Sequence, residues 1–133
     1  MSQENVETVR HYHELLNETG EPPLDLVDRD LEIHMFEGSP IRGPYRGHQG
    51  LLQWREDTFD VIEDWRLELD DVVTGDDPNL MVAFQRFVGR ARHTDLDVDF
   101  PLAVVVRFRA GLISGFEGYR ERREALEAAG LAD

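Results

Sequence analysis

Four consecutive strand-like stretches fill the second half of the chain, and they constrain the fold more than any other feature. The first of them, Trp65 to Asp70, alternates strictly between apolar and polar residues, which is the period of a half-buried β-strand. The connections are short, because TGDDPN is a cluster of turn residues and Ala110-Gly111 is a two-residue link. The chain is therefore expected to form a curved antiparallel sheet, with strands over about 65–70, 80–92, 96–109 and 112–119.

The first half of the chain has the period of helices. A first helix is predicted over roughly 3–18, where apolar residues recur at steps of three and four around His13 and Gly20 provides a stop. Pro22-Pro23 opens a short helical turn that runs through Val27. A second helix is predicted from His48 to about Asp64.

Between these helices, LEIHMF at 31–36 alternates like a strand, and the segment EGSPIRGPYRG reads as an irregular loop. A closing helix follows Arg120. No strand–helix–strand repeats occur, so a doubly wound parallel sheet is not expected. The sequence predicts one α+β domain over 1–133, with the early helices packed across one face of the sheet.

Composition narrows the functions that this domain can have. The chain has 14 basic and 28 acidic residues, a net charge of −14, and a surface this negative repels nucleic acids and anionic membranes. There are no cysteines, which excludes disulfides and thiolate metal sites. The amino terminus has no apolar run of the kind that a signal peptide needs, and a cytoplasmic location is expected. The sequence predicts no cofactor, because no phosphate loop or dinucleotide motif is present, and no metal, because the histidines lack ligand spacing.

Several motifs, taken in order, resemble the SnoaL-like proteins. These are the opening MSQENVETVRHYHELLN, YRGHQGL at the start of the second helix, the RFRAGLIS hairpin and the closing REALEAAGL. SnoaL-like proteins belong to the nuclear transport factor 2-like superfamily, together with ketosteroid isomerase. The resemblance implies a ketosteroid isomerase-like (cystatin-like) fold, a cone-shaped cavity between sheet and helices as the binding site, and a homodimer.

Ketosteroid isomerase also suggests where catalytic groups would lie. It uses an aspartate base, with a tyrosine and a neutral aspartic acid that bind the developing oxyanion. The resemblance places the base position at Met35 and the position of the neutral acid at Val104, and neither side chain can exchange a proton. Tyr12, five residues before Asn17, matches the tyrosine. Isomerisation by that mechanism is therefore not expected.

Side-chain parity then assigns the strand residues to two faces. The inward row of the 96–109 strand is entirely apolar, and the charged Asp97, Asp99 and Arg107 belong to the outward row. In the 80–92 strand, Gln85 is the only polar member of the inward row, and a buried amide needs a partner. Glu117 should point outward and pair with an arginine. In LEIHMF, parity turns Leu31, Ile33 and Met35 inward and Glu32, His34 and Phe36 outward.

Candidate site residues come from both arguments. Tyr12 and His13 are the candidate catalytic groups; both compete for one inward position on the first helix, and a structural role for either stays open. The residues expected to bind a ligand in the cavity are Tyr12, Met35, Trp54, Gln85, Phe87, Phe100, Val104 and Phe116.

Three functions remain open at this point. The first is a largely apolar cavity that binds a small hydrophobic molecule. The second is an isomerase, cyclase or hydrolase acting on a polyketide-, steroid- or terpenoid-like substrate. The third is a non-catalytic dimerisation module, in which an exposed sheet face bearing Phe84, Arg86, Val88, Arg90 and Val105 makes the contact between subunits.

Overall fold

The computed structural model describes residues 2–39, 41 and 43–131 of the chain. The predicted α+β class is confirmed. Along the chain the elements are α1 (Ser2–Thr19), the short 3-10 helix η1 (Leu24–Leu26), β1 (Val27–His34), β2 (Tyr45–Arg46), α2 (Gly47–Val61), β3 (Ile62–Thr74), β4 (Leu80–Ala91), β5 (Asp97–Arg109), β6 (Leu112–Tyr119) and α3 (Arg122–Ala128).

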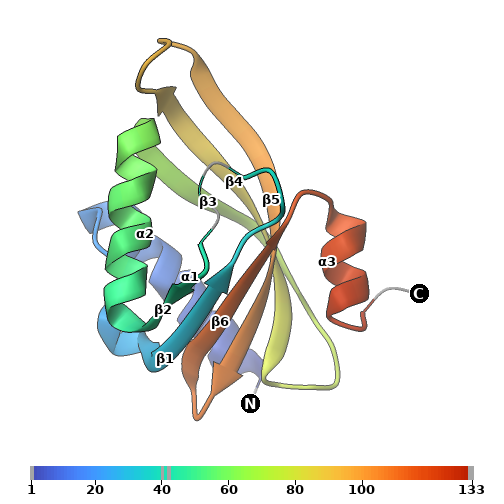
Figure 1. Ribbon diagram of the computed structural model, residues 1–133. Helices are drawn as coiled ribbons and strands as arrows, with labels where there is room; N and C mark the ends of the chain where they lie inside the picture. Colours follow the sequence, from blue (N-terminus) through green and yellow to red (C-terminus); the bar gives the residue numbers. More distant parts are fainter. Residues whose placement is uncertain (1, 40, 42, 132–133) are drawn as a thin grey trace.

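The strands form one curved sheet in the order β2-β1-β6-β5-β4-β3 (Figure 1). The four strands predicted in the second half of the chain pair as consecutive antiparallel neighbours. One pair departs from the expected antiparallel pattern, because β1 runs parallel to β6. No hairpin fixes the relative direction of these two strands, since α2 and four other strands separate them in the sequence.

Element ends differ from the prediction at two places near the cavity. Strand β1 begins at Val27, earlier than expected, and ends at His34. Helix α2 ends at Val61, and the segment from Ile62 that was expected to continue it begins β3 instead. The glycine- and proline-rich loop contains the short strand β2, which was not predicted, while Pro40 and Arg42 of this loop lie outside the described residues, as do 1 and 132–133.

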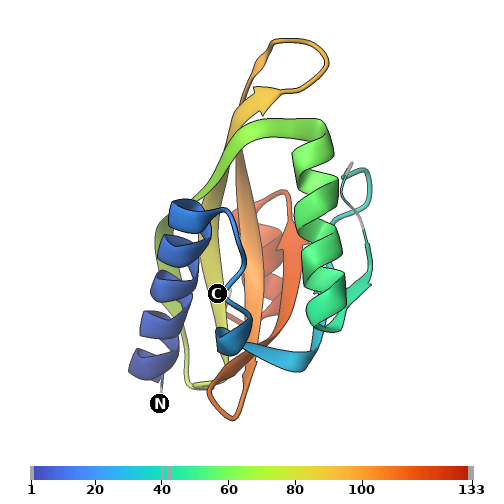
Figure 2. The same cartoon turned by 90° about the vertical axis from the view of Figure 1, so that its left-hand side faces the viewer.

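Helices α1 and α2 both lie on the concave face of the sheet, and α3 lies on the opposite face (Figures 1 and 2). Two asparagines attach helix α1 to strand β3 and to the turn that follows it. The Asn5 amide donates to the Pro78 carbonyl at 2.7 Å. The Asn17 amide donates to the Leu67 carbonyl and accepts from the Leu67 N–H, both at 2.9 Å. These bonds fix which face of α1 is turned toward the sheet.

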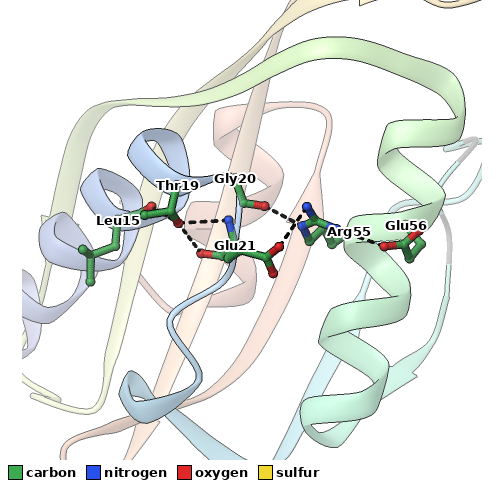
Figure 3. Close-up of polar contacts among 6 residues, drawn as sticks. All are labelled: Leu15, Thr19, Gly20, Glu21, Arg55 and Glu56. Atoms are coloured by element: carbon green, nitrogen blue, oxygen red, sulfur yellow. Dashed lines mark hydrogen bonds and ion pairs between the residues drawn. The ribbon is translucent and has the colours of Figure 1, made fainter.

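A second set of contacts joins the end of α1 to α2 (Figure 3). The Arg55 guanidinium donates to the Gly20 carbonyl and pairs with Glu21 at 3.0 Å and Glu56 at 2.9 Å. Its charged group also lies 4.7 Å from the centre of the Phe59 ring. Arg55 therefore holds the two helices of the concave face together at one end.

The convex face corrects one prediction. Phe84 and Val105 were expected on an exposed face, but they are buried in a separate cluster with Val82 and Ala103. Ala125 and Ala129 belong to the same cluster, because the small side chains of the α3 region allow close packing against the sheet. This part of the face is thus covered within the chain itself.

Candidate ligand cavity

The concave face, α1 and α2 enclose a small deep cavity with an almost entirely apolar wall. Its volume is about 40 Å³. Seven elements contribute to its wall, which consists of Tyr12, Ile33, Met35, Leu51, Trp54, Leu67, Gln85, Phe87, Leu102, Val104 and Phe116. Within the described part of the chain, no carboxylate belongs to this wall.

A larger outer cavity of about 390 Å³ adjoins the deep cavity and shares Met35, Trp54 and Phe87 with it. This volume falls in the range of cavities that hold small molecules. Its other lining residues are Phe36, Ser39, Ile41, Val61, Ile62, Ala91, Asp97, Val98, Asp99 and Phe100.

Tyr12 and His13 are both buried, each with 3% of its surface exposed, so they do not exclude each other. With Val9 and Leu16 they form one stripe at helical steps of three and four, and such a stripe is wide enough for both. Tyr12 is the one that belongs to the deep cavity wall, where its ring lies 5.5 Å from Phe116. Burial raises the pKa of the Tyr12 hydroxyl, which keeps it neutral.

His13 lies behind this wall and contacts Gln85. The His13 Nδ1 is 2.9 Å from the Val9 carbonyl oxygen, and its Nε2 is 2.9 Å from the Gln85 amide nitrogen. Burial lowers the pKa of His13, only partly opposed by the bond to Val9, so the ring is neutral near pH 7. The partner that a buried Gln85 requires is therefore a histidine from α1.

Among the described residues, the Tyr12 hydroxyl and the Gln85 Oε1 of the deep cavity wall have no hydrogen-bond partner, and neither has the indole Nε1 of Trp54 in the same wall. Among all the described residues, Trp65 Nε1 is the one side-chain nitrogen or oxygen that is both sealed from solvent and without a hydrogen-bond partner. Tyr12 Oη and Gln85 Oε1 therefore retain access to open space, although both residues are buried. Both residues belong to the wall of the deep cavity.

Aromatic rings connect the two cavities. Trp54 lies 6.3 Å from Phe87, and Phe87 stacks on Phe100 with ring centres 5.6 Å apart. Phe100 is the outermost of these rings and belongs to the outer cavity, with 36% of its surface exposed. A flat apolar ligand could lie along this row of rings.

Met35 lies where the isomerase base was expected, at the boundary between the two cavities. A Cβ added at Gly118 would approach the Met35 Cε to 2.8 Å and its Sδ to 2.9 Å, so the glycine on β6 makes room for this side chain. Val104, the position of the neutral acid, is buried in the deep cavity wall.

Three side chains near the outer cavity differ from the parity prediction. Phe36 was expected to face outward, but β1 ends at His34, and Phe36 lines the outer cavity. Asp97 and Asp99 were assigned to the outward row, yet both contribute to the rim of this cavity, where β5 begins. Asp99 pairs with Arg86 at 2.7 Å. The strand end and the loop after β1 carry no periodic signal, so parity could not identify these residues.

Outside the cavities, Glu117 pairs with Arg107 at 2.7 Å, as predicted for an outward-facing acid. His34 is exposed and contacts Glu32 at 3.1 Å. Among the described residues, no three histidine or acidic side chains are grouped as metal ligands would be, and no helix has the length and apolarity that crossing a bilayer requires.

The sequence of this domain matches a known family. The model of the SnoaL-like domain matches residues 9–116. The chain belongs to the SnoaL-like family. No functionally curated protein shows significant sequence similarity to this SnoaL-like protein.

Solved structures with the same fold cover nearly the whole chain. Bal32a from a soil-derived mobile gene cassette has a TM-score of 0.79 at 18% identity, covering 96% of this chain and 97% of its own. TerC, co-crystallised with polyporic acid, has a TM-score of 0.74 at 17% identity, covering 95% and 97%. A putative SnoaL-like polyketide cyclase from Jannaschia sp. CCS1 has a TM-score of 0.69 at 13% identity, covering 98% and 94%. At these identities the likeness shows the fold alone.

Proposed function

We propose that this SnoaL-like protein binds a small, largely hydrophobic molecule in the deep and outer cavities, with Tyr12 and Gln85 as its polar contacts. One observation carries the proposal: Tyr12 and Gln85 contribute to the wall of an almost entirely apolar hollow, and neither the Tyr12 hydroxyl nor the Gln85 Oε1 has a hydrogen-bond partner among the described residues. Such atoms are costly to leave unpaired, and native proteins pair them with water or a ligand. Met35, Trp54, Phe87, Phe100, Val104 and Phe116 supply the apolar contacts.

A thermal-shift series with tetralin, a neutral bicyclic hydrocarbon, tests the proposal. Binding to the folded state raises the midpoint of unfolding in proportion to the logarithm of ligand concentration. Val104→Phe fills the deep cavity and should abolish the shift. Tyr119→Phe on β6, outside both cavities, is the matched aromatic control and should keep it. An equal shift in the wild type and Val104→Phe would place binding elsewhere.

Catalysis is the second candidate, and the name of the Jannaschia relative, a putative polyketide cyclase, favours it. In this chain the groups at hand would be the neutral Tyr12 hydroxyl, which can donate a hydrogen bond to a carbonyl, and the neutral His13, whose Nε2 is already bonded to Gln85. Turnover of polyketide- or terpenoid-like substrates that is lost in Tyr12→Phe, with binding retained, would support an enzyme.

The subunit arrangement is also a proposal. A homodimer is the family habit, but α3 of the same chain covers two of the apolar residues that were expected to mediate it. Light scattering at several concentrations gives the oligomeric state, and a monomer at micromolar concentration would exclude the dimerisation module.

A further inference from the structure

The hydrogen-bonded pair of His13 and Gln85 has a definite direction. A carbonyl oxygen only accepts, so the nitrogen of His13 that lies 2.9 Å from the Val9 oxygen, Nδ1, carries the proton. In a neutral ring the other nitrogen, Nε2, then holds a lone pair. The Gln85 group 2.9 Å from this lone pair must be a donor, which means the amide NH₂ and not the amide oxygen.

The direction of this pair determines what the deep cavity offers to a ligand. With one N–H of its NH₂ donated to His13, Gln85 keeps its second N–H and the oxygen Oε1, and this oxygen has no hydrogen-bond partner in the described part of the chain. A carbonyl oxygen accepts hydrogen bonds and cannot donate them. Rotating the Gln85 amide by 180° would place its oxygen against the lone pair of His13 Nε2, and the two would repel. His13, behind the cavity wall, therefore fixes the orientation of the amide.

We infer that His13 is a positioning residue that turns Gln85 Oε1 into a fixed acceptor, and that the deep cavity therefore selects ligands carrying a neutral hydrogen-bond donor, such as an alcohol, phenol or enol. This inference rests on the proposed binding function and specifies its ligand class. A hydroxyl satisfies Gln85 by donating and Tyr12 by accepting. A ketone of the same shape accepts from Tyr12 but leaves the Gln85 oxygen unpaired, which is the situation that polar sites reject most strongly.

Within the described residues, no carboxylate of the deep cavity wall competes with the Gln85 oxygen for a ligand's hydrogen-bond donor. Asp97 and Asp99, the carboxylates nearest to the cavities, belong to the outer cavity rim and not to the deep wall. The charged groups around His13, on the far side from the cavity, are Arg10 and Glu14 of α1 and Arg66 and Glu68 of β3. Among the side chains of the deep cavity wall, the Gln85 amide oxygen is thus the acceptor that cannot also donate, whereas the Tyr12 hydroxyl can do both.

The test compares 1-tetralol with 1-tetralone, two bicyclic molecules that differ only in presenting an alcohol or a ketone. Titration calorimetry on the wild type should show the alcohol bound about tenfold more tightly. In Gln85→Leu the ratio should fall to about one while both molecules still bind. His13→Leu leaves the amide free to turn and should also bring the ratio close to one. His48→Gln, which alters a histidine bonded to the Val27 carbonyl outside both cavities, should keep the wild-type ratio.

The other outcomes separate a failure of this inference from a failure of the proposed function. If tetralin, the alcohol and the ketone bind the wild type equally, the proposed function stands and this inference fails. If none of the three binds, the proposed function and this inference fail together. If the variants do not fold, long-range ¹H–¹⁵N correlation spectra of the wild type give the tautomer directly: a proton on His13 Nδ1 supports the inference, and a proton on Nε2 overturns it.

Discussion

The two faces of β4 and β5 are both buried near their middle, but they are buried in different ways. On the convex face, Val82, Phe84 and Val105 pack in one buried cluster with alanines of the α3 region. On the concave face, Gln85, Phe87 and Val104 border a hollow instead. A short alanine-containing helix can follow the sheet closely, whereas α1 and α2 lie across the concave face (Figure 2), where Tyr12, Leu51 and Trp54 of these helices border the hollow. Burial alone therefore does not distinguish a packed core from a binding site.

Adjacent valines on β5 give the largest contrast between the faces. Val105 is completely buried in the filled cluster, and Val105→Ala should lower the free energy of unfolding by about 2.5 kcal/mol because it creates a new void. Val104→Ala only enlarges an existing hollow and should lower it by about 1 kcal/mol. Urea unfolding of both variants measures the difference. Equal losses would mean that the concave face is as tightly filled as the convex one.

The contact between α1 and α2 should matter next, because it holds the hollow open. Arg55→Met keeps the stem of this largely buried side chain but removes its bonds to Gly20, Glu21 and Glu56. We expect a loss of about 1.5 kcal/mol in unfolding free energy, together with weaker binding of tetralin.

Arg123→Met is the matched control, since Arg123 on α3 is exposed and Glu127 is its one ion-pair partner among the described residues. Its effect on unfolding should stay within about 0.5 kcal/mol. If both variants behaved alike, Arg55 would have no special part in the concave face.

The buried His13 makes the concave face sensitive to pH. Its pKa is lowered in the folded protein, so below the ordinary value of 6.5 the unfolded chain takes up a proton that the folded protein refuses. The contribution of His13 to stability is thus complete above pH 6.5 and is lost as the pH falls toward the folded pKa. Between pH 7.5 and 5.5 the wild type should lose about 1 kcal/mol more than His13→Gln in urea unfolding. Parallel pH curves would show that His13 is protonated equally in both states.

The smallest effect concerns the outer rim. Asp97 there should repel anionic ligands, so Asp97→Asn is expected to strengthen binding of naphthalene-2-carboxylate about threefold at low salt, without changing that of naphthalene. Asp76→Asn, in the turn after β3, removes the same charge away from this rim and is the control. Equal gains in the two variants would reduce the rim effect to net charge.

How much of the structure the sequence predicts depends on whether a segment has a regular side-chain period. Parity along β4 correctly turned Met81, Ala83, Gln85 and Phe87 inward, because a strand with one row facing the helices has a strict period of two. The same parity assigned Phe84 and Val105 to an exposed face, since it cannot show that α3 folds back over them. A sheet covered on both sides loses the polar row that marks solvent.

The site was less predictable than the fold. Helical spacing predicted that only one of Tyr12 and His13 faces inward, but α1 turns both toward the sheet. Only the packing shows that Tyr12 lines the cavity while His13 lies behind Gln85. The pairing of His13 with Gln85 joins residues 72 positions apart, so no local pattern contains it. Phe36 and Asp97 lie at strand ends, where periodicity stops.

A crystal structure of the protein soaked with 1-tetralol tests the central claim most directly, namely that the hollow on the concave face is a site for a small apolar molecule. The account predicts the bicyclic rings between Trp54 and Phe87, with the hydroxyl at hydrogen-bond distance from Gln85 Oε1. A concave face closed by Met35 and Trp54, with the alcohol absent or bound only at the surface, would contradict it.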